Sequence, residues 1–352
     1  MNKLQTQLSN QELAYQHLEI LKTLQAPSGL FLASSKGVST GYDKAWLRDN
    51  FYTSLAFEKV GDWETVGRLW RALLDIFLKH ENKISWAIEN RPHESWQYIH
   101  ARYHPETFEE FWEEWGNKQN DAVGAILFKI GDLEEQGKKV IKEEDDQRII
   151  QRLVDYLYSL KYWEDPDSGV WEENEEIHAS SLGACVAGLK KIQSLSFVKI
   201  PEDIIKKGEE ALRKLLPRES EGKFADLALL SLIYPFDIVT QEEAQEILEN
   251  VEYHFVRHRG VIRYKNDRYY NKNIDGWSEE AEWTMGFPWL AIIYSRLGDK
   301  EKARSYLEQA KKVLTPEGKM PELYFSNSEK PNENIPLAWA ESLFIVALLE
   351  LG

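Results

Sequence analysis

The sequence contains one cysteine, Cys185, which excludes an intramolecular disulfide framework. Basic residues are outnumbered: 43 Lys and Arg stand against 59 Asp and Glu, for a net charge of −16. Nucleic acids and anionic membrane surfaces attract basic faces, so neither is expected as a partner. Apolar runs stay below the ~18 residues of a membrane-spanning helix. The first residues, MNKLQTQLSNQELAYQ, lack the apolar segment of a signal peptide, and with the lone cysteine this predicts a cytoplasmic protein.

Several catalytic signatures are missing as well. The sequence has no GxGxxG or GxxxxGK[ST] loop for a nucleotide, no GxSxG elbow for a nucleophilic serine, and no Cys and His residues at zinc spacing. Cys185 stands between Ala and Val in a predicted helix, which favours an inert buried residue. We therefore expect neither a cofactor nor a metal site.

Aromatic residues, by contrast, are abundant, with 13 Trp, 16 Tyr and 14 Phe. Tryptophan is large, carries an N–H donor and is rarely fully buried. Core packing accounts for part of this count, but the remainder favours a cleft lined with aromatic surfaces. Sugars are neutral and have flat C–H faces that stack on indole rings, so the acidic charge is no obstacle to such a ligand.

Most of the chain has the apolar spacing of amphipathic helices. Capping boxes at Ser9–Glu12 and Thr240–Glu243 mark two helix starts. Gly-Asp pairs at 61–62, 131–132 and 298–299 are typical of tight turns, because Gly accepts the left-handed conformation and Asp caps the next helix. About twelve helices are expected, over residues 10–25, 45–60, 62–80, 119–136, 145–161, 179–195, 201–216, 222–233, 240–251, 281–297, 299–314 and 336–350.

The connections between these helices alternate in length. Long ones are predicted at 81–118, 162–178, 259–280 and 315–335, with short β pieces near 29–33 and 260–264. Long loops on one side and tight turns on the other are typical of a helical barrel with a functional face. The prediction is an all-α fold with one domain over residues 1–352.

Two short motifs contain candidate catalytic carboxylates. Trp171 precedes Glu172 and Glu173, and apolar cover by an indole raises the pKa of a carboxyl group, as a general acid near neutral pH requires. Pro321 stiffens the backbone before Glu322, which suits a positioned base. Taken alone, the first motif is more typical of an exposed acidic loop and the second of a turn before a helix.

Further motifs contain residue types that bind sugars. Arg48 and Asp49, close to Tyr42 and Trp46, can present donors and acceptors to sugar hydroxyls, although a helix cap with a surface salt bridge explains them equally well. The other candidates are Trp115 as a stacking surface, Gln119 and Asp121 at the start of the next helix, Arg263, Trp283 and Trp339.

In chain order these motifs resemble glycoside hydrolase family 15, the glucoamylase-like clan. They resemble its relative, the N-terminal domain of phosphorylase kinase alpha and beta subunits, at least as closely. The resemblance runs from residue 29 to about residue 347. It is carried by WLRDN at 46–50, IHARY at 99–103, WGNKQND at 115–121, GVWE at 169–172, EW at 282–283, PELY at 321–324 and PLAW at 336–339. The resemblance implies an (α/α)6 barrel, a six-hairpin toroid with long loops on one face.

The resemblance also implies roles for single residues. Glu172 falls on the family's general acid and Glu322 on its general base. The implied reaction is exo-acting and inverting, with the two carboxyl groups ~6.5–9.5 Å apart to admit a water. The substrate is an α-glucan or a related oligosaccharide. Its contacts are expected at Tyr42, Trp46, Arg48, Asp49, Trp115, Gln119, Asp121, Glu173, Arg263, Trp283 and Trp339.

Two functions of different class remain open from the sequence. The first is an α-glucoside hydrolase that releases glucose from non-reducing ends. The second is a non-catalytic glucan-binding or regulatory module, favoured by the local similarity of IHARY and PELY to the kinase subunits. A different (α/α)6 enzyme, such as an unsaturated-glycoside hydrolase or an epimerase, would not be expected to reproduce these motifs in this order.

Overall fold

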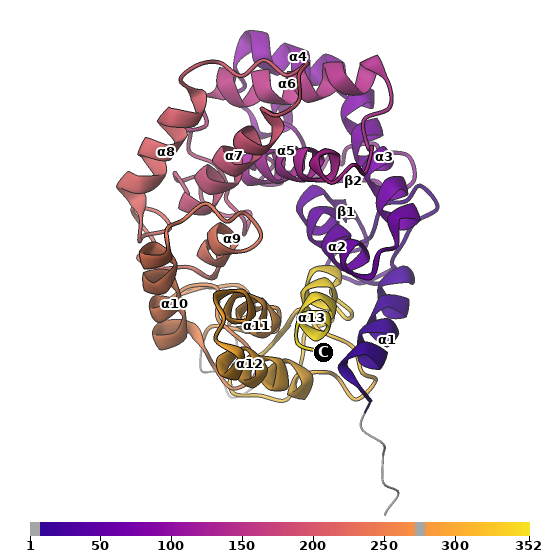
Figure 1. Cartoon of the computed structure of the whole chain (residues 1–352), viewed down its shortest axis with the longest axis vertical. Coiled ribbons are helices and arrows are strands. Elements are labelled where there is room, and N and C mark those ends of the chain that lie inside the picture. The colour runs from indigo at the N-terminus through magenta and orange to yellow at the C-terminus, as the bar shows by residue number, and fades with distance from the viewer. Residues whose placement is uncertain (1–7, 272–278) are drawn as a thin grey trace, which may run out of the picture.

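Helices dominate the computed structural model, which describes residues 8–271 and 279–352. Six helices form an inner ring, and the remaining helices lie outside it (Figure 1). The inner helices are α2 (Leu47–Val60), α5 (Asn120–Glu135), α7 (Ala179–Ile192), α9 (Leu230–Ile233), α11 (Gly286–Leu297) and α13 (Ala338–Glu350). The outer helices are α1 (Asn10–Lys22), α3 (Trp63–Lys79), α4 (Glu81–Asn90), α6 (Glu144–Leu160), α8 (Ile204–Leu215), α10 (Gln241–Phe255) and α12 (Lys300–Lys312).

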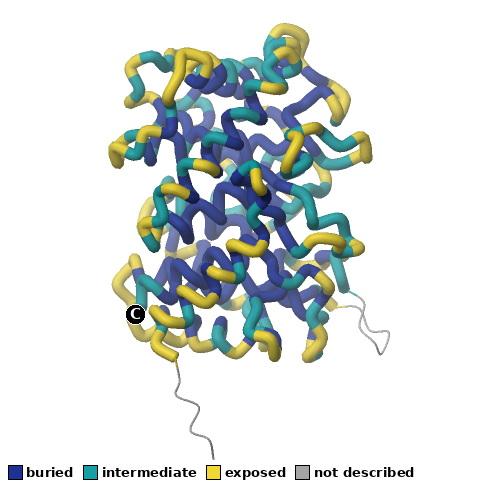
Figure 2. The backbone as a smooth tube through the Cα atoms, turned by 90° about the vertical axis from the view of Figure 1, so that its right-hand side faces the viewer, coloured by how far each residue is buried: buried dark blue, intermediate teal, exposed yellow. Residues whose placement is uncertain are grey.

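The inner ring is closed, because each inner helix contacts the next and α13 returns to α2. This confirms the predicted all-α (α/α)6 barrel. Helix α13 is buried at every position from Ala338 to Leu348, as expected of a helix that is apolar all round. Helix α8 instead buries Ile204, Gly208 and Leu212, a single stripe that faces the ring. Figure 2 shows the same division, with buried segments inside and exposed segments at the periphery.

Two of the three predicted Gly-Asp turns are confirmed. Gly61 ends α2 with φ 77°, and Asp62 caps α3 by accepting the backbone N–H of Thr65. Gly298 ends α11 with φ 89°, and Asp299 caps α12. These left-handed glycines reverse the chain between an inner helix and the following outer helix.

The third predicted turn, at Gly131, is wrong. Gly131 lies inside α5, where a Cβ atom would come within 2.8 Å of the Lys191 backbone on α7. Gly124 and Gly188 meet across the same interface, so the glycines allow two inner helices to approach closely. Helix α5 ends instead at Glu135, with Gln136 as its C-cap and Gly137 following at φ 72°. A glycine at a helix end and a glycine at a helix crossing look alike in sequence.

Other differences concern short elements. The predicted connection 81–118 contains helix α4, and the predicted helix 222–233 is a 3-10 turn followed by the short α9. The predicted helices 45–60 and 281–297 each begin with a two-residue strand, β1 (Ala45–Trp46) and β3 (Glu282–Trp283). The predicted β pieces near 29–33 and 260–264 contain isolated bridges rather than strands, at Phe31 and Val261.

The long connections gather at one end of the barrel. Apart from α3 and α4, which follow each other on the outside, inner and outer helices alternate along the chain, and the N-termini of the inner helices face that end. Two antiparallel ladders brace it: β1 pairs with β2 (Arg102–Tyr103), and β3 pairs with β4 (Leu323–Tyr324). Residues 272–278 of the predicted connection 259–280 lie outside the described residues. Among the residues described, no helix has the length and apolarity needed to cross a membrane.

Candidate active site

A pocket opens at the N-terminal ends of the inner helices, and aromatic and charged side chains dominate its lining. Strand β1 and the start of α2 supply one side, the loop between α6 and α7 a second, and the segments around β3 and β4 the others. The lining residues are Tyr42, Trp46, Arg48, Asp49, Val170, Trp171, Glu172, Arg263, Trp283, Met285, Glu322, Leu337 and Trp339. Both candidate catalytic carboxylates therefore face one cavity, although about 150 residues separate them in the sequence.

Glu172 lies in a tight loop with an unusual backbone. Its φ is 61°, in the left-handed region that non-glycine residues rarely occupy, and Gly169 in the same loop has φ 64°. The carboxylate accepts hydrogen bonds from Trp115 Nε1 at 2.6 Å, Gln119 Nε2 at 2.9 Å and Arg48 at 3.4 Å. Sequence reasoning expected apolar cover from Trp171, whereas the structure surrounds the Glu172 carboxylate with hydrogen-bond donors.

Arg48 is held from behind by residues at the start of α5. Its guanidinium donates to both carboxylate oxygens of Asp121, at 2.6 and 3.0 Å, and to Gln119 Oε1 at 2.7 Å. Burial alone would lower the pKa of Arg48, but Asp121 and Glu172 outweigh it and raise the pKa. Gln119 and Asp121 thus contact Arg48 and are not among the residues that line the pocket.

Asp49 lies beside Arg48 in the pocket wall. Burial raises the pKa of its carboxyl group to about 7, against the opposing effect of Arg48, and the charges of Glu172 and Glu322 raise it further. A carboxyl group with that pKa can both donate and accept hydrogen bonds near neutral pH, which suits the recognition of sugar hydroxyls.

Glu322 immediately precedes β4 and is buried. Its Oε2 accepts hydrogen bonds from the amides of Asn332 and Asn334, the latter at 2.8 Å, and from the Tyr269 hydroxyl at 3.5 Å. Burial raises the pKa of Glu322, whereas Asn334, Asn332 and Arg263 oppose that rise. The two amides fix the carboxylate in one orientation, since both donate to the same oxygen.

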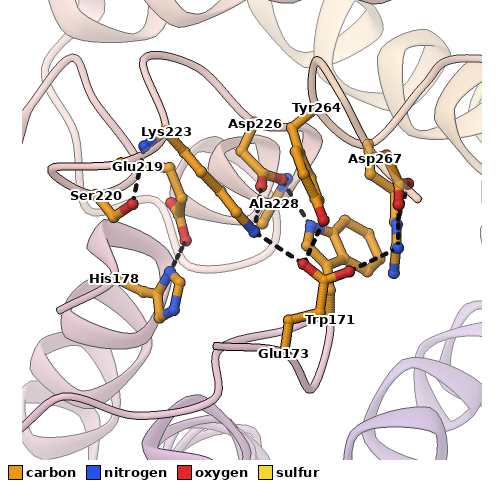
Figure 3. A network of polar contacts seen from close by, with 12 residues as sticks. Trp171, Glu173, His178, Glu219, Ser220, Lys223, Asp226, Ala228, Tyr264 and Asp267 are labelled. Carbon is orange, nitrogen blue, oxygen red and sulfur yellow. Dashed lines mark hydrogen bonds and ion pairs between the residues drawn. The ribbon is translucent and has the colours of Figure 1, made fainter. Parts of the chain in front are cut away.

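Glu173 belongs to a network of polar contacts beside the pocket (Figure 3). It accepts from Arg263 at 2.8 Å, from the Tyr264 hydroxyl, and from Lys223 at 3.3 Å. Arg263 is itself paired with Asp267 through two hydrogen bonds of 2.7 Å each. Arg263 therefore lines the pocket in a fixed position, while Glu173 lies outside the lining.

The same network anchors the loop of the candidate acid. Trp171 Nε1 donates to the buried Asp226 at 2.7 Å, and Lys223 lies 3.6 Å from Asp226 (Figure 3). The Trp171 ring stacks on Trp339 with 6.0 Å between ring centroids and lies 5.4 Å from Trp283. These three indoles form an aromatic wall, and the hydrogen bond from Trp171 to Asp226 fixes it on one side.

Trp115 was expected to stack on a sugar, but one face of its ring is occupied. The Arg102 guanidinium lies 3.6 Å from the ring centroid. The indole nitrogen points instead to Glu172, as described above. In this structure Trp115 is a hydrogen-bond donor to the candidate acid, and it lines a neighbouring cavity.

The remaining predicted site residues lie together in the pocket. They are Tyr42, Trp46, Arg48, Asp49, Glu172, Arg263, Trp283, Glu322 and Trp339. Sequence reasoning missed the side chains that orient them, above all Asn332, Asn334, Tyr269, Asp226 and Lys223. An Asn-x-Asn pattern ten residues after Glu322 was the one available signal, and its partner becomes evident only when the loop folds back. Within residues 8–271 and 279–352 no group of three or more His, Cys, Asp or Glu side chains has the arrangement of a metal site.

Comparison with known proteins shows which family and which proteins this chain is similar to. The model of glycosyl hydrolases family 15 matches residues 7–350. A probable phosphorylase b kinase regulatory subunit alpha from Drosophila melanogaster is 26% identical, covering 95% of this chain and 32% of that protein. The skeletal muscle isoform of that subunit from Oryctolagus cuniculus is 25% identical, covering 88% of this chain and 30% of that protein. The chain thus spans about a third of the length of these curated relatives.

Solved structures with the same fold include glycosidases. A wild-type glycosidase has a TM-score of 0.82 at 20% identity, covering 97% of each chain. The glucoamylase of Hormoconis resinae has a TM-score of 0.72 at 13% identity, covering 97% of this chain and 73% of that one. A bacterial glucoamylase complexed with acarbose has a TM-score of 0.73 at 16% identity, covering 96% and 55%. At such identities these likenesses establish the fold and no more.

Proposed function

Because this chain belongs to glycosyl hydrolases family 15, we propose that it is an inverting, exo-acting α-glucoside hydrolase. It would release glucose from the non-reducing ends of short α-glucans or related oligosaccharides in the cytoplasm. The observation that carries the proposal is the presence of Glu172 and Glu322 in one aromatic pocket, each with its own set of hydrogen-bond donors. A binding module would not need two carboxylates oriented in this way.

In the proposed reaction Glu172 protonates the glycosidic oxygen as the bond to the anomeric carbon breaks. Loss of this proton turns Glu172 into a carboxylate, and the donors from Trp115, Gln119 and Arg48 stabilise the negative charge as it develops. These hydrogen bonds strengthen toward the transition state, so they lower the barrier rather than merely bind the substrate. This is the physical reason for surrounding a general acid with donors.

Glu322 acts from the opposite face of the sugar ring. Asn332 and Asn334 hold Oε2, and the other oxygen, Oε1, takes a proton from the attacking water. The water adds to the anomeric carbon from that face, so the configuration inverts. The terminal glucose would lie against Trp46, Trp171 and Trp339, with its hydroxyl groups bound by Arg48 and Asp49.

A second candidate function is supported by the curated relatives. They are regulatory subunits of a kinase, and they align with almost the whole of this chain. The corresponding proposal is a barrel that binds a glucan, or a partner protein, without turnover. It predicts saccharide binding at the same pocket and no product.

One experiment separates the two. The purified protein is incubated with maltose, isomaltose, trehalose and a maltodextrin, and glucose release is followed with time. The hydrolase proposal predicts turnover on at least one linkage, with loss of turnover in Glu172→Gln and Glu322→Gln. The regulatory proposal gains if wild type and both variants release glucose at the same background rate while still binding a saccharide.

A further inference from the structure

A second cavity, larger than the catalytic pocket, lies beside it along the connection between α4 and α5. Its volume is about 1050 Å³, just above the ~300–1,000 Å³ of typical small-molecule sites. Four aromatic residues line it, Trp96, Phe111, Trp112 and Trp115. The described mechanism uses Trp115 through its indole nitrogen alone, so the cavity has no role in that chemistry.

Two of these indoles are exposed to solvent. Trp112 is fully exposed, at 103%, and Trp96 is 66% exposed. Single exposed apolar residues are ordinary on protein surfaces, but tryptophan is usually buried in large part. The two exposed indoles lie in one hollow beside Phe111, whose own ring is covered by the Lys44 ammonium at 4.1 Å, so Trp96 and Trp112 supply the aromatic surface that faces water. Such a surface is typical of a site that stacks flat ligands.

The charge of the cavity restricts the ligand. Five glutamates line it. Three of them are paired with lysines, Glu109 with Lys79, Glu110 with Lys83 and Glu113 with Lys44, whereas Glu94 and Glu114 have no ion pair among the described residues and leave the lining negative. Burial lowers the pKa of His100 to about 3, so this lining imidazole is neutral at pH 7. An anionic ligand would be repelled here. A neutral ligand with many hydroxyl groups fits better, because its C–H faces stack on indoles and its hydroxyls donate to carboxylates such as Glu114.

The cavity is separated from the catalytic pocket by a shared wall. Trp115 lines the cavity and donates its N–H to Glu172 on the other side, at 2.6 Å. Arg102 fills the space over the Trp115 ring, at 3.6 Å. A ligand in the cavity therefore lies next to the pocket but outside it.

We infer that this cavity is a second saccharide site, which holds a neutral α-glucan chain against Trp96 and Trp112 outside the catalytic pocket. The choice of an α-glucan rests on the proposed function, whereas the aromatic surface and its charge do not. The site would keep a long substrate near the pocket between successive cleavages.

The test uses β-cyclodextrin, a closed ring of α-linked glucose that has no non-reducing end for an exo-acting pocket. Binding to wild type, Trp96→Ala, Trp112→Ala and the control Tyr253→Ala is measured by isothermal titration calorimetry. Tyr253 is a matched control because it is 85% exposed on α10, away from the cavity. Circular dichroism checks that each variant folds, which the exposure of all three side chains leads us to expect.

Wild type and Tyr253→Ala should bind β-cyclodextrin equally. Each Trp variant should bind roughly 5- to 150-fold more weakly, the range seen when one stacking aromatic is removed from a flat ligand. Equal binding by all four proteins, or no binding by wild type, would overturn the inference and leave the indoles to a protein partner. Glucose release from maltose, isomaltose, trehalose and a maltodextrin by the same preparation is scored separately. Cyclodextrin binding without glucose release would remove the hydrolase proposal and retain this site.

Discussion

The hydrogen bond from Trp115 to Glu172 offers a test of the mechanism through a single N–H group. Replacing Trp115 by Phe removes the donor, which lies 2.6 Å from Glu172 Oε2, and keeps an aromatic ring under the Arg102 guanidinium. A hydrogen bond to a charged group contributes about 1.5–3 kcal/mol. If that energy is realised as Glu172 becomes a carboxylate, Trp115→Phe should lower kcat by roughly 10- to 150-fold.

The assay is the initial rate of glucose release over a range of maltose concentrations, which separates kcat from KM. A fall in kcat with little change in KM indicates stabilisation of the transition state. A rise in KM alone would show that Trp115 is a binding surface for sugar, as its sequence context suggested. A kcat within twofold of wild type would refute the reasoning, and the thermal unfolding midpoint controls for loss of fold.

Three further predictions concern the base, a buried ion pair and the inner ring. Glu322→Gln should reduce turnover by about 10²- to 10⁴-fold, and the acid limb of the wild-type pH–rate profile should lie above pH 4.5, because burial raises the pKa of Glu322. Burial opposes the charge on His178, but Glu219 and Asp167 prevail and raise its pKa to about 9. The charged His178 should therefore stabilise the folded protein by about 3 kcal/mol, an effect that is complete below pH 6.5 and lost as pH rises through 9. Urea titrations at several pH values should find this pH dependence of the unfolding free energy much reduced in Glu219→Gln. Gly188→Ala should destabilise by about 1–3 kcal/mol or more, since its Cβ would lie 2.3 Å from a carbonyl oxygen of α5, whereas Gly67→Ala, with open space, should not.

Much of the fold could be predicted from helical periodicity, because barrel helices have long and regular apolar patterns. The failures have local physical causes. Gly131 carries the same Gly-Asp signal as Gly61, yet it serves a close helix crossing, and that depends on a neighbour about 60 residues away. Helix α4 has only two buried residues, Ile84 and Ala87, so its apolar signal is weak. Two-residue strands are set by their partners rather than by their own sequence.

For the site, sequence patterns identified the side chains that face the pocket better than those that support them. Glu172, Glu322 and Arg48 stand in recognisable motifs, and all three line the pocket. Asn334 and Asp226 act through contacts made across loops, with Glu322 and Trp171 respectively, and nothing next to them in sequence indicates those partners. Residue types predict chemistry, whereas orientation depends on how distant loops meet.

The proposed function depends above all on the anomeric outcome of the reaction. Proton NMR of freshly released glucose, recorded within minutes of adding the protein to a maltodextrin, reports the configuration at the cleaved non-reducing end before mutarotation. A general acid at Glu172 and a general base at Glu322 predict β-glucose from the wild type and no release above background from Glu172→Gln. Release of α-glucose, or release that survives loss of either carboxylate, would contradict the account.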